Sequence, residues 1–110
     1  MELHDLKLNL TELINNLTLR MDSIADSFKS LQLAEANERL AYFIDDISVV
    51  AEVVAILKSA YPLLDLDELN AKLSTLLEQS ENEDYLYVAD LISYELKPLL
   101  EYWGELLQDA

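Results

Sequence analysis

The chain has 110 residues, of which 22 are acidic and seven are basic, so its formal net charge is -15. An apolar fraction of 52% is too high for a disordered acidic tail, and one Gly and two Pro are too few for a β-rich fold. The absence of Cys excludes disulfides, thiolate metal sites and a cysteine nucleophile. The sequence therefore predicts an all-α protein, with residues 1–110 as a single domain.

The first predicted helix covers about residues 9–30. Its apolar residues alternate spacings of four and three, which is typical of one buried helix face. This seam consists of Leu10, Ile14, Leu17, Met21, Ile24, Phe28 and Leu31. Because neither Gly nor Pro follows, only the change of phase after Leu31 indicates where the helix ends.

The second predicted helix, about residues 34–60, contains most of the longest apolar run, "ISVVAEVVAILKSAYPLL". A membrane span needs roughly 20 apolar residues, so this run, which Glu52 interrupts, is not expected to be one. Beside its main seam the helix carries a second apolar row, made of Val49, Val53, Ile56 and Ala60. We predict that such a helix lies at the centre of a bundle or is covered by another chain.

Two further helices follow Pro62. The third is predicted over residues 66–79, where Asp65 and Glu68 have the spacing of a capping box. The fourth is predicted over residues 84–107 and contains Pro98, which removes a backbone hydrogen bond and favours a kink or a break there. Since the connecting loops are short, these elements predict a single-domain antiparallel bundle of about four helices.

One face of the fourth helix is a candidate partner-binding surface. At about 100° per residue, tyrosines gather on the side opposite the predicted core seam. The candidate residues are Tyr87, Leu91, Tyr94 and Tyr102, with Glu95 and Glu101 on or beside the row. A tyrosine row bordered by carboxylates suits a basic, amphipathic segment of another protein. The alternative is a helix buried on two sides, with each tyrosine hydroxyl directed to water.

Catalytic motifs do not emerge from the sequence, so we expect no enzyme and no cofactor. The single glycine, Gly104, excludes a glycine-rich phosphate loop, and the seven scattered cations disfavour direct nucleic-acid binding. Carboxylates three or four residues apart, such as Asp22 and Asp26, leave open a metal site held by carboxylates alone. The start, "MELHDLKLNL", lacks the pattern of a secretory signal, so we expect a cytoplasmic protein.

The stretch "SENEDYLYVADLISYELKPLLEYW", residues 80–103, resembles the C-terminal part of small, functionally uncharacterised acidic helical proteins of Gram-positive bacteria. The stretch "EANERLAYFIDDI", residues 35–47, is similar to their central part. In size, acidity and helicity the chain is also similar to flagellar and secretion chaperones, and this likeness implies a protein that binds export substrates in a helical groove. Neither resemblance assigns a role to any residue.

We therefore expect a non-enzymatic adaptor or chaperone-like module that binds a basic or amphipathic segment of another protein by helix packing. The alternatives are an acidic inhibitor that mimics nucleic acid and a small metal-binding bundle that uses carboxylates only. The apolar surplus on the second helix also favours a homodimer, which the charge of -15 opposes.

Overall fold

The predicted helical seams all form helices. The computed structural model describes residues 2–108; Met1, Asp109 and Ala110 of the predicted domain lie outside the described range. The elements are α1 (Leu3–Lys29), α2 (Leu33–Leu57), α3 (Leu66–Glu81), α4 (Tyr85–Leu91), the π-helical turn η1 (Ile92–Leu96) and α5 (Lys97–Gln108). Because α4, η1 and α5 follow one another without a gap, the described residues form four helical arms and no strand. The expected all-α fold is confirmed.

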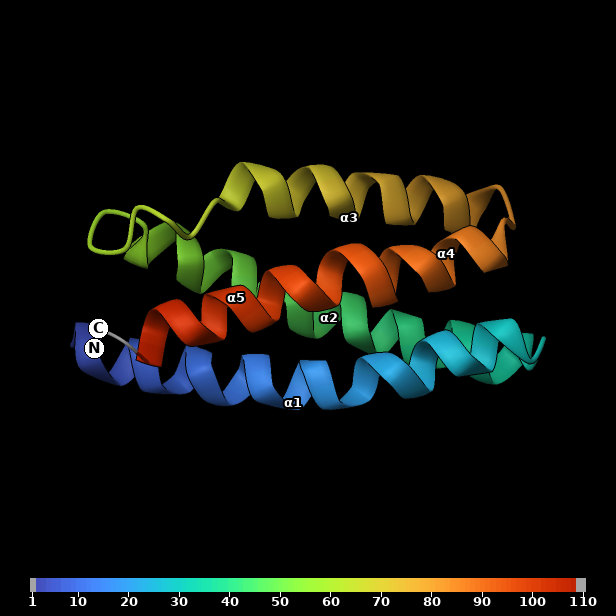
Figure 1. Ribbon diagram of the computed structural model, residues 1–110, viewed down its shortest axis with the longest axis horizontal. Coiled ribbons are helices and arrows are strands. Elements are labelled where there is room, and N and C mark those ends of the chain that lie inside the picture. Colours follow the sequence, from blue (N-terminus) through green and yellow to red (C-terminus); the bar gives the residue numbers. More distant parts are fainter. Residues whose placement is uncertain (1, 109–110) are drawn as a thin grey trace.

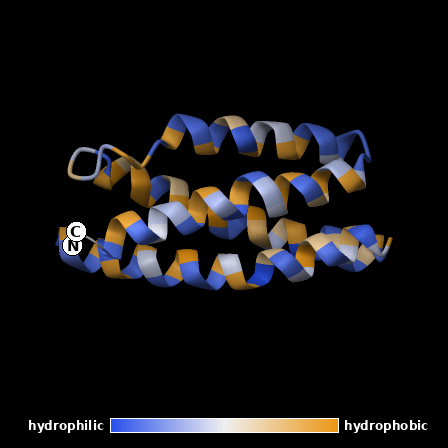
Figure 2. Cartoon of the chain, viewed as in Figure 1, coloured by the Kyte–Doolittle hydropathy of each residue, from blue (hydrophilic) through white to orange (hydrophobic). Residues whose placement is uncertain are grey.

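Successive arms run antiparallel around a ring (Figure 1). α1 contacts α2 as well as α4, η1 and α5, and α3 contacts both α2 and α4. The bundle is elongated, with principal extents of 42 × 22 × 21 Å. Figure 2 shows hydrophobic and hydrophilic residues alternating along each arm, as a bundle with one shared core requires. The chain thus forms the antiparallel four-helix bundle that its sequence predicts.

The two long seams supply most of the core. On α2, every residue of the main seam is buried: Ala36, Leu40, Phe43, Ile47, Val50, Val54 and Leu57. The predicted central position of this helix is not what the structure shows. α2 packs mainly on α1, and Val49 and Ile56 of its second apolar row remain 46% and 57% exposed.

The apolar character of α2 does not extend far enough for a transmembrane helix. Across residues 2–108, no helix has both the length and the hydropathy needed to cross a bilayer.

Several helix ends differ from their predicted positions. α1 begins at Leu3 rather than near residue 9, because Leu3 and Leu6 continue its seam. α2 ends at Leu57 rather than near residue 60, since Pro62 disfavours helical geometry in the residue before it. α3 begins where predicted: the Asp65 side chain accepts the Glu68 N–H at 3.1 Å, as an N-cap does.

The turns after α1 and α3 share one geometry and lie at the same end of the bundle (Figure 1). Leu31 and Glu83 both have a φ of 59°, in the left-handed region. After α1, the N–H of Leu31 donates to the Phe28 carbonyl at 3.1 Å, and the N–H of Gln32 donates to the Ser27 carbonyl at 3.0 Å. This pattern satisfies the last helical carbonyls and usually places Gly at the left-handed position. The turn therefore ends α1 without a glycine at the left-handed position.

Leu31→Gly is expected to raise the free energy of unfolding by about 0.5–1 kcal/mol. A non-glycine residue in the left-handed region costs about 1–2 kcal/mol, and the greater freedom of glycine in the unfolded chain returns part of the gain. Little burial is lost, because Leu31 is 68% exposed. Chemical denaturation measures the change, with Leu31→Ala as a control that keeps the strained backbone and gains nothing. A loss of stability in Leu31→Gly contradicts the turn geometry.

The fourth arm is interrupted by η1 just before Pro98. The N–H of Lys97 donates to the carbonyl of Ile92, five residues back rather than four. Pro98 has no N–H, and its ring crowds the carbonyl of Tyr94, so a wider turn at this point accommodates the proline. The irregularity predicted near Pro98 is confirmed, and it takes the form of a π turn within a continuous arm.

Candidate functional site

The predicted tyrosine face is exposed only in part. Its tyrosines are accessible, with exposed fractions of 44% for Tyr87, 70% for Tyr94 and 45% for Tyr102. Leu91 is 3% exposed, so its predicted place on this surface is wrong. The reason is that α4 contacts both α1 and α3 and therefore buries residues on two sides.

The tyrosine face is also divided between two sides of the fourth arm. Tyr87, Leu91 and Glu95 line a groove against α3, where Lys72 Nζ donates to Glu95 Oε1 at 3.2 Å. Tyr94 lies toward α1 instead, with the Nζ of Lys29 at 5.9 Å from the centre of its ring. Because η1 widens the helix between them, Tyr87 and Tyr94 do not continue one straight row.

The two predicted carboxylates of this face lie near cations of the same chain. Lys97 Nζ donates to both carboxylate oxygens of Asp22 on α1, at 3.0 and 2.9 Å. This hydrogen bonding, with the attraction of the Asp22 and Glu101 charges, raises the pKa of Lys97 above its usual value. Glu101 is thus close to Lys97, as Glu95 is to Lys72. Both carboxylates are partly neutralised within the fold, which weakens the predicted rim.

The outer side of α2 carries a continuous apolar row. Tyr42, Val49 and Ile56 follow one another at intervals of seven residues and are 62%, 46% and 57% exposed. Seven residues make about two helical turns, so the three side chains lie in line over roughly 21 Å. Four residues before each position, about 40° round the helix, comes an exposed acidic row of Glu38, Asp45 and Glu52. We call these six residues the α2 outer face.

Short side chains border the acidic row on its other side. Ala41, Ser48 and Ala55 repeat the same interval of seven residues and are exposed. Because the distance between two packed helices depends on the size of the side chains at the contact, these short side chains allow another helix to approach closely. The outer face therefore combines an apolar stripe, a charged border and open space beside them.

A groove between α1 and α2 begins at the Tyr42 end of this face. Its volume is about 580 Å³, and its lining consists of Arg20, Ser23, Ile24, Arg39, Tyr42 and Asp46. We call it the arginine groove, because it holds both arginines of the chain.

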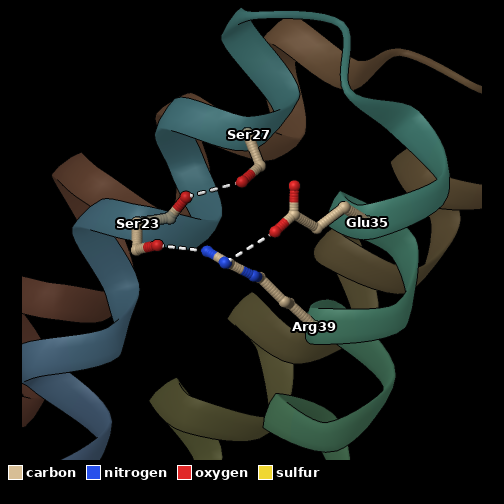
Figure 3. Close-up of polar contacts among 4 residues, drawn as sticks. All are labelled: Ser23, Ser27, Glu35 and Arg39. Carbon is tan, nitrogen blue, oxygen red and sulfur yellow. Dashed lines mark hydrogen bonds and ion pairs between the residues drawn. The ribbon is translucent and has the colours of Figure 1, made fainter.

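Both arginines hold α2 against α1. Figure 3 shows Arg39 reaching across to Ser23, whose Oγ accepts from Nη1, while Nη2 donates to Glu35 Oε1 at 2.7 Å. Arg20 Nη1 donates to Asp46 Oδ2 at 2.7 Å and to Asn16 Oδ1 at 2.9 Å. The four side chains of the two ion pairs are between 36% and 51% exposed, so solvent and ligands reach them.

Asp22, one of the carboxylates considered for a metal site, pairs with Lys97 instead. Within residues 2–108, no three His, Asp or Glu side chains are arranged to hold one metal ion.

The sequence contained signals for both features of α2. The second apolar row and the polar stripe are visible from their spacing, but that pattern fits a helix buried on several sides as well as one that awaits a partner. The meeting of Arg20 with Arg39 also follows from topology. In an antiparallel hairpin that turns near Leu31, residues about equally far from the turn lie side by side, and Arg39 accordingly contacts Ser23.

A family model described as a domain of unknown function, DUF8042, matches residues 5–106, from α1 into α5. The chain belongs to this family. No curated protein and no solved structure matches it.

Proposed function

We propose that this member of the DUF8042 family is a non-enzymatic, chaperone-like binding module of the cytoplasm that holds a basic, amphipathic helix of another protein. The observation that carries the proposal is the α2 outer face, where Tyr42, Val49 and Ile56 stand in solvent in one line. Aligned apolar residues on a helix are the usual anchors for a second helix. The tyrosine face of the fourth arm is the rival surface.

The charge of the face selects the partner. Glu38, Asp45 and Glu52 border the apolar row along its length and are exposed. A helix with apolar residues on one side and Lys or Arg on the flank packs on the apolar row and forms ion pairs with the acidic row. The net charge of -15 accelerates the encounter of such a helix with the protein. To cover the row from Tyr42 to Ile56, such a helix needs about 15 residues or more.

A second copy of this chain is the competing occupant of the same face. In a symmetric pair, Asp45 and Glu52 of one protomer approach the same residues of the other, and like charges at an interface oppose binding. A basic partner has no such cost. Sedimentation equilibrium at physiological salt is therefore expected to show a monomer, and a dimer abolished by Val49→Glu assigns the face to self-association.

A salt titration of the purified partner complex tests the proposal. We expect affinity to fall as salt rises from about 50 mM and then to level off, because salt screens the acidic row and leaves the apolar contacts. Replacing Glu38, Asp45 and Glu52 by Gln, Asn and Gln lowers the affinity at low salt and flattens the titration. An affinity that keeps falling steeply up to about 1 M salt contradicts the proposal and identifies an acidic mimic of nucleic acid.

The rival tyrosine face is tested with the same complex. Tyr87→Ala and Tyr94→Ala are expected to leave the affinity unchanged, since the two rings lie on different sides of the fourth arm. If either variant weakens binding by more than about 1 kcal/mol while the fold persists, the tyrosine face is the surface and the assignment to α2 is wrong.

A further inference from the structure

The arginine groove adjoins the apolar row of α2 on the side away from the acidic row. Asp46 follows Tyr42 by four residues and Glu38 precedes it by four, so the two lie about 40° to either side of Tyr42 round the helix. Asp46 and Tyr42 both line the groove, which therefore opens beside the row and toward α1. A helix docked on the apolar row passes along the edge of this groove.

The charges around the groove cancel in pairs. Arg20 is paired with Asp46 and Arg39 with Glu35, and each pair is 2.7 Å apart. A charged group that enters the groove is attracted by one member of each pair and repelled by the other. The groove therefore favours neither a carboxylate nor an ammonium group, whereas a neutral side chain enters without disturbing either pair.

The same ion pairs hold both guanidinium groups by their edges. A guanidinium is planar and donates its hydrogen bonds within that plane. Arg39 donates to Ser23 and Glu35, and Arg20 donates to Asp46, so these bonds fix each plane without covering its faces. The two side chains are 42% and 36% exposed. A flat guanidinium face that is held in place and open to solvent is a good stacking surface for an aromatic ring.

We infer that the arginine groove receives an aromatic side chain of the docked helix, which stacks on the guanidinium groups of Arg20 and Arg39. The inference rests on the proposed function and adds the class of residue that anchors the partner beside Tyr42. The groove volume of about 580 Å³ is ample for one such side chain. Its lining also includes the Tyr42 ring and Ile24, which is 2% exposed and offers apolar contact. Aromatic residues seated in pockets are the usual anchors of an interface.

Matched peptides test the inference. The probe is a helix of about 18 residues, with leucines spaced to face the apolar row and lysines on the flank. One position at the end of its apolar stripe holds either phenylalanine or cyclohexylalanine, which has nearly the same shape but no π-system. The position is placed near the N-terminus in one pair of peptides and near the C-terminus in another, so that either direction of docking is covered. We expect phenylalanine to bind about fivefold more tightly than cyclohexylalanine in one of the two pairs.

A third pair of peptides and a variant of the protein locate the effect. With the test position in the middle of the peptide, opposite Val49 and away from both arginines, phenylalanine should have no advantage. The double variant Arg20→Lys/Arg39→Lys keeps both positive charges and removes the planar faces, so the preference for phenylalanine should fall below about twofold. Circular dichroism verifies that this variant is folded.

NMR of the wild-type protein gives a second readout that needs no variant. The Nε–H resonances of Arg20 and Arg39 should shift upfield with the phenylalanine peptide and not with the cyclohexylalanine peptide, because an aromatic ring shields groups above its face. Cyclohexylalanine that binds as tightly as phenylalanine in both end pairs overturns the inference, since the groove is then only apolar. A phenylalanine preference that survives in the double lysine variant also overturns it.

The proposed function fails by a different result. If Val49→Ser/Ile56→Ser leaves all the peptides bound as tightly as the wild type does, the outer face is not the docking surface and the inference falls with it. If this variant weakens all the peptides while phenylalanine and cyclohexylalanine bind alike at every position, the face stands and the aromatic anchor is wrong.

Discussion

Replacing Trp103 by alanine is expected to lower the free energy of unfolding by about 3–5 kcal/mol, as truncation of a large buried aromatic residue usually does. Trp103 has no exposed surface and is the largest of the fully buried side chains. It lies on α5, which packs against α1 closely enough that a Cβ added at Gly104 would stand 3.8 Å from Ile14 Cγ2. Such close helices cannot collapse into the cavity without moving the arms. Urea denaturation followed by circular dichroism measures the loss.

Trp103→Phe separates the cavity from the indole N–H. Among residues 2–108, no group accepts a hydrogen bond from Trp103 Nε1, so the tryptophan buries an unsatisfied donor. Phenylalanine removes that donor and keeps most of the aromatic packing, and we expect a loss below about 1.5 kcal/mol. If Trp103→Ala costs less than about 1 kcal/mol, the residue is not the centre of the core that its burial implies.

The double variant Val49→Ser/Ile56→Ser is expected to weaken partner binding by more than tenfold, on the usual scale for two interface anchors. Both side chains are already half exposed, so the free energy of unfolding should change by less than about 1 kcal/mol. Leu77→Ser on α3 is the matched control, since Leu77 is 45% exposed and Val49 is 46% exposed. Fluorescence anisotropy with the labelled partner segment measures each affinity.

The control decides what a loss of binding means. Equal losses in the double variant and in Leu77→Ser indicate that exposed apolar surface in general holds the partner. Unchanged binding in the double variant, with the fold intact, shows that the outer row of α2 makes no contact.

Much of the fold follows directly from the order of residues. The alternating seams of residues 10–28 and 36–57 specify two long helices, and Asp65 and Pro98 mark an N-cap and an irregular turn. The end of α1 could be located only roughly, because Leu31 occupies a left-handed position where glycine is usual. Residue propensities do not predict a leucine in this conformation, because the hydrogen bonds of the turn outweigh the backbone strain at Leu31.

The binding surface was harder to predict than the fold. A straight helix was assumed for the tyrosine row, and η1 breaks that assumption between Tyr87 and Tyr94. The row on α2 was visible as Val49 and Ile56, but a sequence does not state whether an apolar row faces its own chain or solvent. Only the packing of α1 and α3 against the other sides of α2 shows that no other helix covers this row.

Hydrogen exchange of the complex tests most directly whether the α2 outer face is the binding surface. The protein is exchanged alone and with saturating partner segment, and protection is read along the whole chain. The account predicts that binding slows exchange over residues 38–56 and at the facing residues 20–24 of α1, while residues 85–102 exchange as they do in the free protein. Protection confined to residues 85–102, with α2 unchanged, would contradict it.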